Sequence, residues 1–225
     1  MLPADRQKLA LAADPLEADT RKALEKWFVA ESAFLEFFEE FEEEGVYPDR
    51  LGKCSVASPR QHPELHGAAS EVADVLGITV PDIFVYESYS HVCDSEGMRR
   101  PRLEISARIL RNYTDDELKH VVAKEMYHIY AGHLRLEVMA EKMLGLIAAV
   151  PSLPGIAMIR QFGGAAAFDL IGFNVRNTAF RWFERACFSA ENFATAYVGN
   201  IGASVDATLL GVLNERSLVS ALSLP

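Results

Sequence analysis

The residues from Lys124 to His133 carry the clearest chemical pattern in this sequence, Lys-Glu-Met-Tyr-His followed by Ile-Tyr-Ala-Gly-His. In the pattern His-Glu-x-x-His, two histidines four residues apart on one helix hold Zn²⁺, and the glutamate between them activates the metal-bound water as a general base. Glu125 occupies the base position and His128 the second ligand position. Lys124 stands at the first ligand position, where its ammonium group has no lone pair to offer a metal.

A second segment, from Trp182 to Asn192, reads Trp-Phe-Glu-Arg-Ala-Cys-Phe-Ser-Ala-Glu-Asn. With the first segment, and with Pro81–Tyr86 and Pro101–Ser106 in the same order along the chain, it makes the sequence similar to the HtpX and CAAX prenyl protease family of zinc metallopeptidases, which are gluzincins. That family carries a third metal ligand, and an aspartate that orients a metal-binding histidine, in a pattern close to W.R..ElSaDRA. Here Cys187 stands where the resemblance places the third ligand, a glutamate, and Glu191 stands where it places the aspartate.

The resemblance implies a helix-rich α+β fold of the zincin type, with a small sheet over the active-site helix. A second helix would bring Cys187 and Glu191 opposite Lys124 and His128. The resemblance also implies zinc as the cofactor and hydrolysis of peptide bonds by zinc-bound water. Family members are often embedded in a membrane, but the longest uncharged apolar run here, from Met143 to Ile159, is shorter than the ~20 residues that span a bilayer.

Three interpretations of these substitutions stay open. In the first, the Lys124 ammonium replaces the charge of the metal and is neutralised by Glu125 and Glu191. The zinc site is then remodelled, ordinary zinc endopeptidase activity is lost, and the old cleft of this pseudoenzyme binds a peptide or a small molecule. In the second, a residual zinc endopeptidase uses Glu125 as base with His128 and Cys187 as ligands. In the third, a repurposed metal-free enzyme uses Lys124, Glu125 or Cys187, for example through a Schiff base or a thiolate–imidazole pair.

Composition narrows the class of protein. The chain has 225 residues with 22 basic and 32 acidic side chains, which gives a net charge of −10 and argues against a nucleic-acid partner. One soluble domain is expected, divided into residues 1–46 (an N-terminal amphipathic helix), 47–113 (a connector, a short helix and a small sheet) and 114–225 (the active-site helices). Three dispersed cysteines and an N-terminus without signal-peptide features favour a reducing, cytoplasmic location. An alternative role for the acidic, phenylalanine-rich segment 36–44 is to dock a partner protein.

Periodicity predicts the elements that position the motif. Helices are expected over residues 20–44, 63–76, 114–150, 174–198 and 203–222, and strands over 82–87 and 102–106. Thr114 with Glu117 forms a capping-box sequence at the start of the motif helix. The segment between the two strands is expected to be turn-rich, and residues 47–63 a connector. His133 is interpreted as structural, and the remaining histidines, which are scattered, are expected to have no function.

Overall fold

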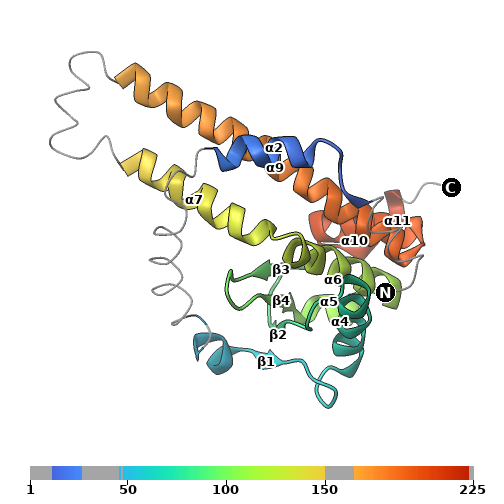
Figure 1. Cartoon of the computed structure of the whole chain (residues 1–225). Helices are drawn as coiled ribbons and strands as arrows, with labels where there is room; N and C mark the ends of the chain where they lie inside the picture. The colour runs from blue at the N-terminus through green and yellow to red at the C-terminus, as the bar shows by residue number, and fades with distance from the viewer. Residues whose placement is uncertain (1–11, 27–45, 47, 150–164, 223–225) are drawn as a thin grey trace.

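Helix α6 (Asp115–Tyr130), which carries the Lys-Glu-x-x-His motif, begins where the sequence predicts. The Thr114 side chain accepts a hydrogen bond from the Glu117 amide, and the Glu117 side chain accepts one from the Thr114 amide. These two bonds satisfy amides that have no partner within the helix. The computed structural model describes residues 12–26, 46, 48–149 and 165–222, and its overall arrangement is seen in Figure 1.

The described residues are rich in helix and form one small sheet, which confirms the predicted α+β class. The other elements, in chain order, are α2 (Glu17–Glu25), β1 (Ser55–Val56), α4 (Pro63–Leu76), β2 (Asp82–Tyr86), β3 (Cys93–Glu96), β4 (Arg102–Ser106), α5 (Ala107–Asn112), α7 (His133–Ala149), α9 (Ala165–Val198), α10 (Ile201–Leu213) and α11 (Arg216–Leu222).

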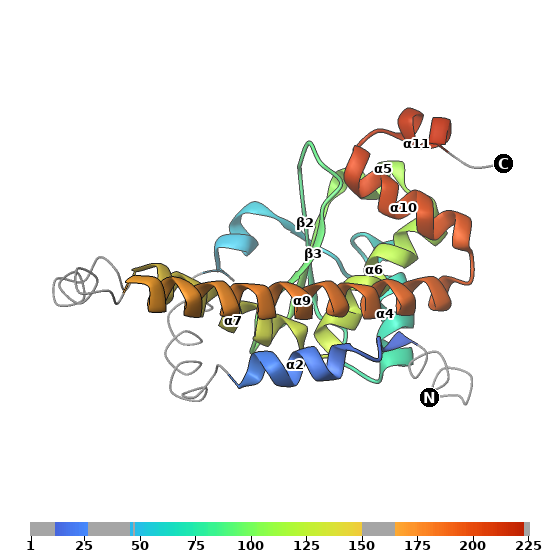
Figure 2. The same cartoon turned by 90° about the horizontal axis from the view of Figure 1, so that it is seen from above.

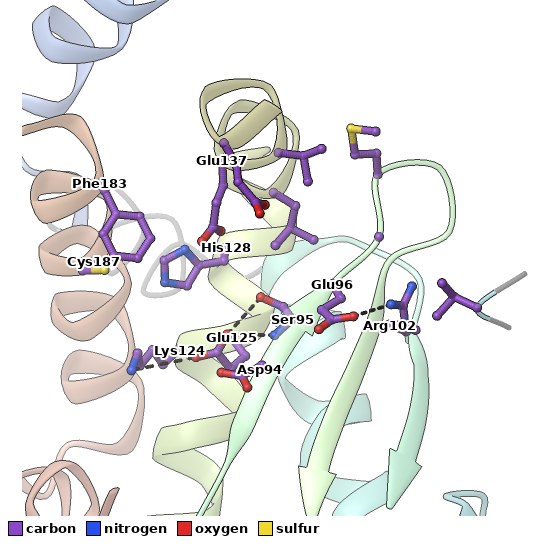
Figure 3. A pocket seen from close by; sticks show the side chains of 16 residues that line it. Asp94, Ser95, Glu96, Arg102, Lys124, Glu125, His128, Glu137, Phe183 and Cys187 are labelled. Carbon is purple, nitrogen blue, oxygen red and sulfur yellow. Dashed lines mark hydrogen bonds and ion pairs between the residues drawn. The ribbon is translucent and has the colours of Figure 1, made fainter. Parts of the chain in front are cut away.

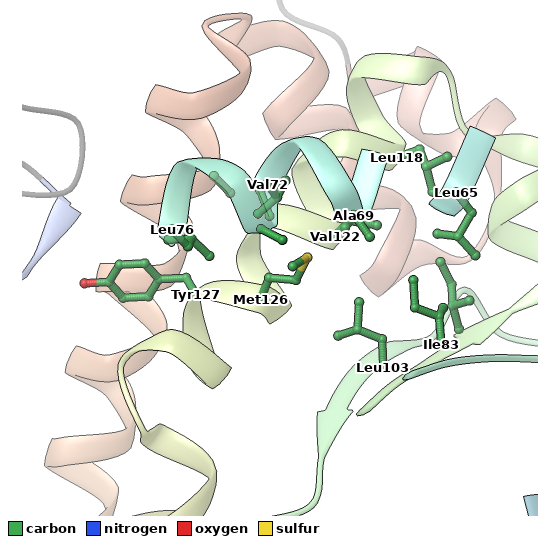
Figure 4. Close-up of a cluster of buried hydrophobic side chains, with 14 of the residues drawn as sticks. Leu65, Ala69, Val72, Leu76, Ile83, Leu103, Leu118, Val122, Met126 and Tyr127 are labelled. Atoms are coloured by element: carbon green, nitrogen blue, oxygen red, sulfur yellow. The ribbon is translucent and has the colours of Figure 1, made fainter. Parts of the chain in front are cut away.

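The sheet has the order β1-β2-β4-β3, in which β2 and β4 are parallel and the outer pairs are antiparallel. Apolar residues of β2 and β4 meet apolar residues of α4 and α6 in the main core (Figure 4). Representative members are Leu65, Val72, Ile83, Leu103 and Met126, each at most 1% exposed. This core fixes the orientation of α6 against the sheet. It therefore determines the direction in which the motif side chains of α6 point.

Two strands correct the sequence prediction. β1 lies in the segment expected to be a connector, and β3 lies in the segment expected to be turn-rich. β1 has only two residues, and the Cys-Asp-Ser-Glu sequence of β3 is polar, so neither shows the alternation that identifies a strand. Both are strands because their backbones pair with β2 and β4.

The predicted helix boundaries need correction at four places. The single helix expected over 114–150 is two helices, because Gly132 adopts φ +70° between α6 and α7. The helix expected over 203–222 is also two, and Asn214 at φ +57° separates α10 from α11. α9 begins at Ala165 rather than at residue 174. The first helix begins at Glu17, and most of its predicted range, residues 27–44, lies outside the described residues.

The long helix α9 packs against α6, which carries the motif, and against α2 and α7. Figures 1 and 2 show α7 alongside the first half of α9, α2 beside the middle of α9, and the second half of α9 against α6. A second buried cluster joins α2, α7 and α9 through Leu24, Leu136 and Trp182. No helix within the described ranges is both long and apolar enough to cross a bilayer.

Candidate functional site

The motif side chains of α6 face a cavity of about 510 Å³ between α6, β3, α7 and α9 (Figure 3). Lys124, Glu125 and His128 all line it, because His128 lies four residues after Lys124 and three after Glu125, and residues at both spacings are neighbours on a helix surface. α9 contributes Phe183 and Cys187 from the opposite side. The structure therefore brings together the two segments that the sequence singled out. A volume of this size is within the range of small-molecule and peptide side-chain pockets.

Lys124 makes two ionic contacts in this cavity. Its Nζ lies 3.3 Å from Glu191 Oε1 and 3.8 Å from Glu125 Oε1, and its side chain is 32% exposed. Burial by itself would lower the pKa of Lys124, but the two carboxylates outweigh burial and hold the pKa above its ordinary value. Lys124 is therefore a protonated ammonium at neutral pH.

Glu125 is buried between α6 and the sheet. Its Oε2 accepts hydrogen bonds from the backbone amide of Ser95, at 3.1 Å, and from the Ser95 hydroxyl, at 2.9 Å. Burial raises the pKa of Glu125 to about 7, although Lys124 and Ser95 both favour the charged form. A carboxyl group that titrates near neutral pH can both accept and donate a proton, as a general acid–base group must.

Glu191 on α9 connects Lys124 to a histidine that the sequence prediction discounted. While Oε1 faces Lys124, Oε2 lies 3.0 Å from Nε2 of the buried His120. Burial would raise the pKa of Glu191, but the contacts with His120 and Lys124 lower it below its ordinary value. The signal was present in the sequence, since His120 precedes Lys124 by four residues and so lies on the same face of α6.

His128 belongs to a buried chain of hydrogen bonds that reaches α2. His128 Nδ1 lies 3.0 Å from His133 Nδ1, and His133 Nε2 lies 2.8 Å from Glu17 Oε1. Ser189 on α9 also donates a hydrogen bond to Glu17. Burial, followed by the influence of His133 and Lys124, lowers the pKa of His128 to about 3, so the ring is neutral. His133, interpreted from sequence as structural, thus contacts a motif residue directly. No pattern in the sequence indicated that Glu17 belongs to this chain of hydrogen bonds.

Cys187 lines the cavity as a half-buried free thiol. Burial raises the pKa of its thiol to about 11. In the described part of the chain it forms no hydrogen bond with His128, so the thiolate–imidazole pair considered from sequence is not formed in this structure.

The family profile of peptidase family M48 matches residues 59–211, more than half of the chain, and the match includes the motif of α6 and the facing segment of α9. The chain belongs to peptidase family M48. This result confirms the resemblance to HtpX-like metallopeptidases at the level of the family. No curated protein matches the chain.

Members of family M48 are generally zinc-dependent. A catalytic zinc ion takes three protein ligands and a water. Within the described ranges, no group of three or more His, Cys, Asp or Glu side chains is arranged to hold a metal ion. Of the three positions that the resemblance assigns to ligands, His128 keeps the usual donor, Cys187 offers a protonated thiol, and Lys124 offers a cation.

Proposed function

We propose that this M48 protein has a remodelled zinc site, lacks ordinary zinc endopeptidase activity and uses the former active-site cavity to bind a ligand. One observation carries the proposal: the Lys124 ammonium stands at the first ligand position and contacts Glu191 at 3.3 Å and Glu125 at 3.8 Å. The positive charge that a zinc ion would bring to this site is thereby supplied by a side chain.

Electrostatics supports this proposal. A zinc ion beside His128 and Glu125 would share a small, partly buried volume with a second cation, and like charges repel strongly where water is scarce. Neutralising Lys124 would require removing a proton from a group whose pKa is already raised. The residues present therefore do not fit a catalytic zinc centre, and no reaction step is assigned to zinc.

The raised pKa of Glu125 favours a second candidate, a metal-free enzyme in which Glu125 acts as general acid or base. The same structure argues against nucleophilic roles for its neighbours. An amine nucleophile must be neutral, and a thiol nucleophile must be ionised, whereas Lys124 and Cys187 are both protonated at neutral pH. In this candidate, Glu125→Gln abolishes turnover that a chelator does not affect.

A restoration experiment tests the proposal. The wild-type protein, the double variant Lys124→His with Cys187→Glu, and the control variant Lys119→His are assayed for cleavage of fluorescently labelled casein, with added zinc and with a chelator. Lys119 lies on the same helix but pairs with Glu71, away from the cavity. We expect no chelator-sensitive cleavage by the wild type or the control, and zinc-dependent cleavage by the double variant, because it regains the ligand types of the family.

Zinc-stimulated, chelator-sensitive cleavage by the wild-type protein would contradict the proposal. Loss of that cleavage in Cys187→Ala would then identify the residual metallopeptidase with His128 and Cys187 as ligands. If instead the wild type cleaves in the presence of chelator and Glu125→Gln does not, the metal-free enzyme is the better account.

A further inference from the structure

The cavity contains carboxylates that its own cations do not neutralise. Both of the cations that line it are already engaged, since Lys124 pairs with Glu191 and Arg102 pairs with Glu96 and Glu104. Three further carboxylates line the same cavity without an ion pair to any described residue: Asp94, Glu137 and Glu141. The cavity therefore carries an excess of negative charge.

Helix stability does not account for Glu137 and Glu141. They lie four residues apart on α7, and two like charges at this spacing destabilise a helix. Burial, followed by the charges of Glu141 and Asp94, raises the pKa of Glu137 above its ordinary value. A bound cation would relieve this repulsion, whereas in the free protein it remains.

His128 adds a polar atom that also lacks a partner. The residue is 7% exposed and lines the cavity, and its Nε2 has no hydrogen-bond partner among the described residues. The other ring nitrogen of His128, Nδ1, is already engaged with His133 Nδ1 at 3.0 Å. His128 Nε2 can therefore form a hydrogen bond with a ligand in the cavity.

An aromatic ring completes the lining. Phe183 on α9 borders the cavity next to His128 and Cys187 (Figure 3), and it is 42% exposed. The face of an aromatic ring attracts ammonium and guanidinium groups, and arginine makes this contact more often than lysine. Carboxylates and an aromatic face are two kinds of group that both favour a cation bearing N–H donors.

We propose that this cavity binds the guanidinium group of an arginine side chain in a peptide, with Glu137 and Asp94 as its anionic contacts and Phe183 as its stacking surface. The proposal rests on the proposed function, because it names the ligand of the remodelled cleft. Arginine fits better than lysine for a geometric reason. Its planar group offers five donors in a fixed fork, stacks on aromatic rings and is more weakly hydrated than an ammonium.

The test measures binding of fluorescein-labelled Gly-Gly-Arg-Gly-Gly to the full-length protein by fluorescence anisotropy. Two companion peptides carry citrulline, which has the same shape without the charge, or lysine at the central position. We expect the arginine peptide to bind about tenfold more tightly than the citrulline peptide, because the neutral urea leaves the carboxylates uncompensated. The lysine peptide should bind with intermediate affinity.

Matched variants locate the site. Glu137→Gln keeps the shape and removes one charge, and we expect about fivefold weaker binding of the arginine peptide. Phe183→Leu should weaken binding about threefold through loss of the ring. The control, Glu184→Gln, makes the same charge change on an exposed residue of α9 that does not line this cavity. It should stay within about twofold of the wild type, because exposed charges act weakly at a distance.

Equal binding of the arginine and citrulline peptides would overturn the inference, and so would equal effects of Glu137→Gln and Glu184→Gln. Absence of measurable binding would overturn it as well. Each of these results leaves the proposed loss of zinc chemistry standing, because that proposal is judged by chelator-sensitive cleavage. Conversely, zinc-dependent cleavage by the wild-type protein would refute the proposed function. If the wild type also binds the arginine peptide selectively, the inference about the ligand of the cavity still stands.

Discussion

Replacement of Glu125 by glutamine should change how the stability of the protein depends on pH. Burial raises the pKa of Glu125 from 4.5 to about 7. Between these two values the folded protein binds more protons at this position than the unfolded chain does, so the free energy of unfolding falls as pH rises. The side chain is only 11% exposed, so solvent screening reduces the effect little. Full ionisation therefore costs the wild-type protein about 3 kcal/mol above pH 7.

Glutamine cannot ionise and keeps an oxygen that can accept the hydrogen bonds from Ser95. The Glu125→Gln variant should therefore lack this part of the pH dependence. Relative to the wild type, its free energy of unfolding should rise by about 2–3 kcal/mol between about pH 5 and pH 8.5. Groups distant from Glu125 that titrate in this range are present in both proteins and cancel in the comparison.

Urea unfolding followed by tryptophan fluorescence at several pH values measures this difference. Glu184→Gln, an exposed carboxylate on α9, is the control and should follow the wild type at every pH. A difference between Glu125→Gln and the wild type that stays constant from about pH 5 to pH 8.5 would refute the reasoning. It would mean that Glu125 titrates in the folded protein as it does in the unfolded chain.

Three further predictions concern stability and are checked by the same unfolding measurement. Glu191→Gln removes the contacts with Lys124 and His120 and should cost about 1–2 kcal/mol at pH 7. Because the pKa of Glu191 is lowered by folding, this cost should shrink as pH falls below 4.5; a cost that persists in acid would contradict the assigned contacts. Thr114→Ala removes the capping hydroxyl of α6 and should cost about 1 kcal/mol, whereas no change would show that the cap is unimportant. Gly97→Ala should cost about 1–3 kcal/mol, because φ is +89° and the new Cβ would lie 2.6 Å from a backbone oxygen; an unchanged stability would contradict that turn geometry.

Local signals in the sequence predicted the elements that they control directly. Pro63 at the first turn of α4 and Gly77 at its end, with φ +71°, bound that helix as expected. The capping box of Thr114 and Glu117 placed the start of α6. The spacing of Lys124, Glu125 and His128 then sufficed to predict one chemical face, because helix geometry fixes it.

The remaining features depend on contacts between distant parts of the chain. β3 supplies Ser95 to Glu125, but its polar sequence becomes a strand only by pairing with β4. The hydrogen bond between Glu17 and His133 joins residues 116 positions apart, and no local sequence pattern near either residue indicates it. The excess charge of the cavity could not be predicted either, since it requires knowing which carboxylates the lysine and arginine side chains neutralise.

The central claim is that Lys124 takes the place of a zinc-bound histidine, and metal content tests it most directly. The wild-type protein and the double variant Lys124→His with Cys187→Glu are purified without chelator, incubated with zinc, desalted and analysed for zinc per chain. We predict well below one zinc per wild-type chain and about one per chain of the double variant. About one zinc per wild-type chain, lost in Cys187→Ala, would contradict the claim and show that the metal site of the family survives in altered form.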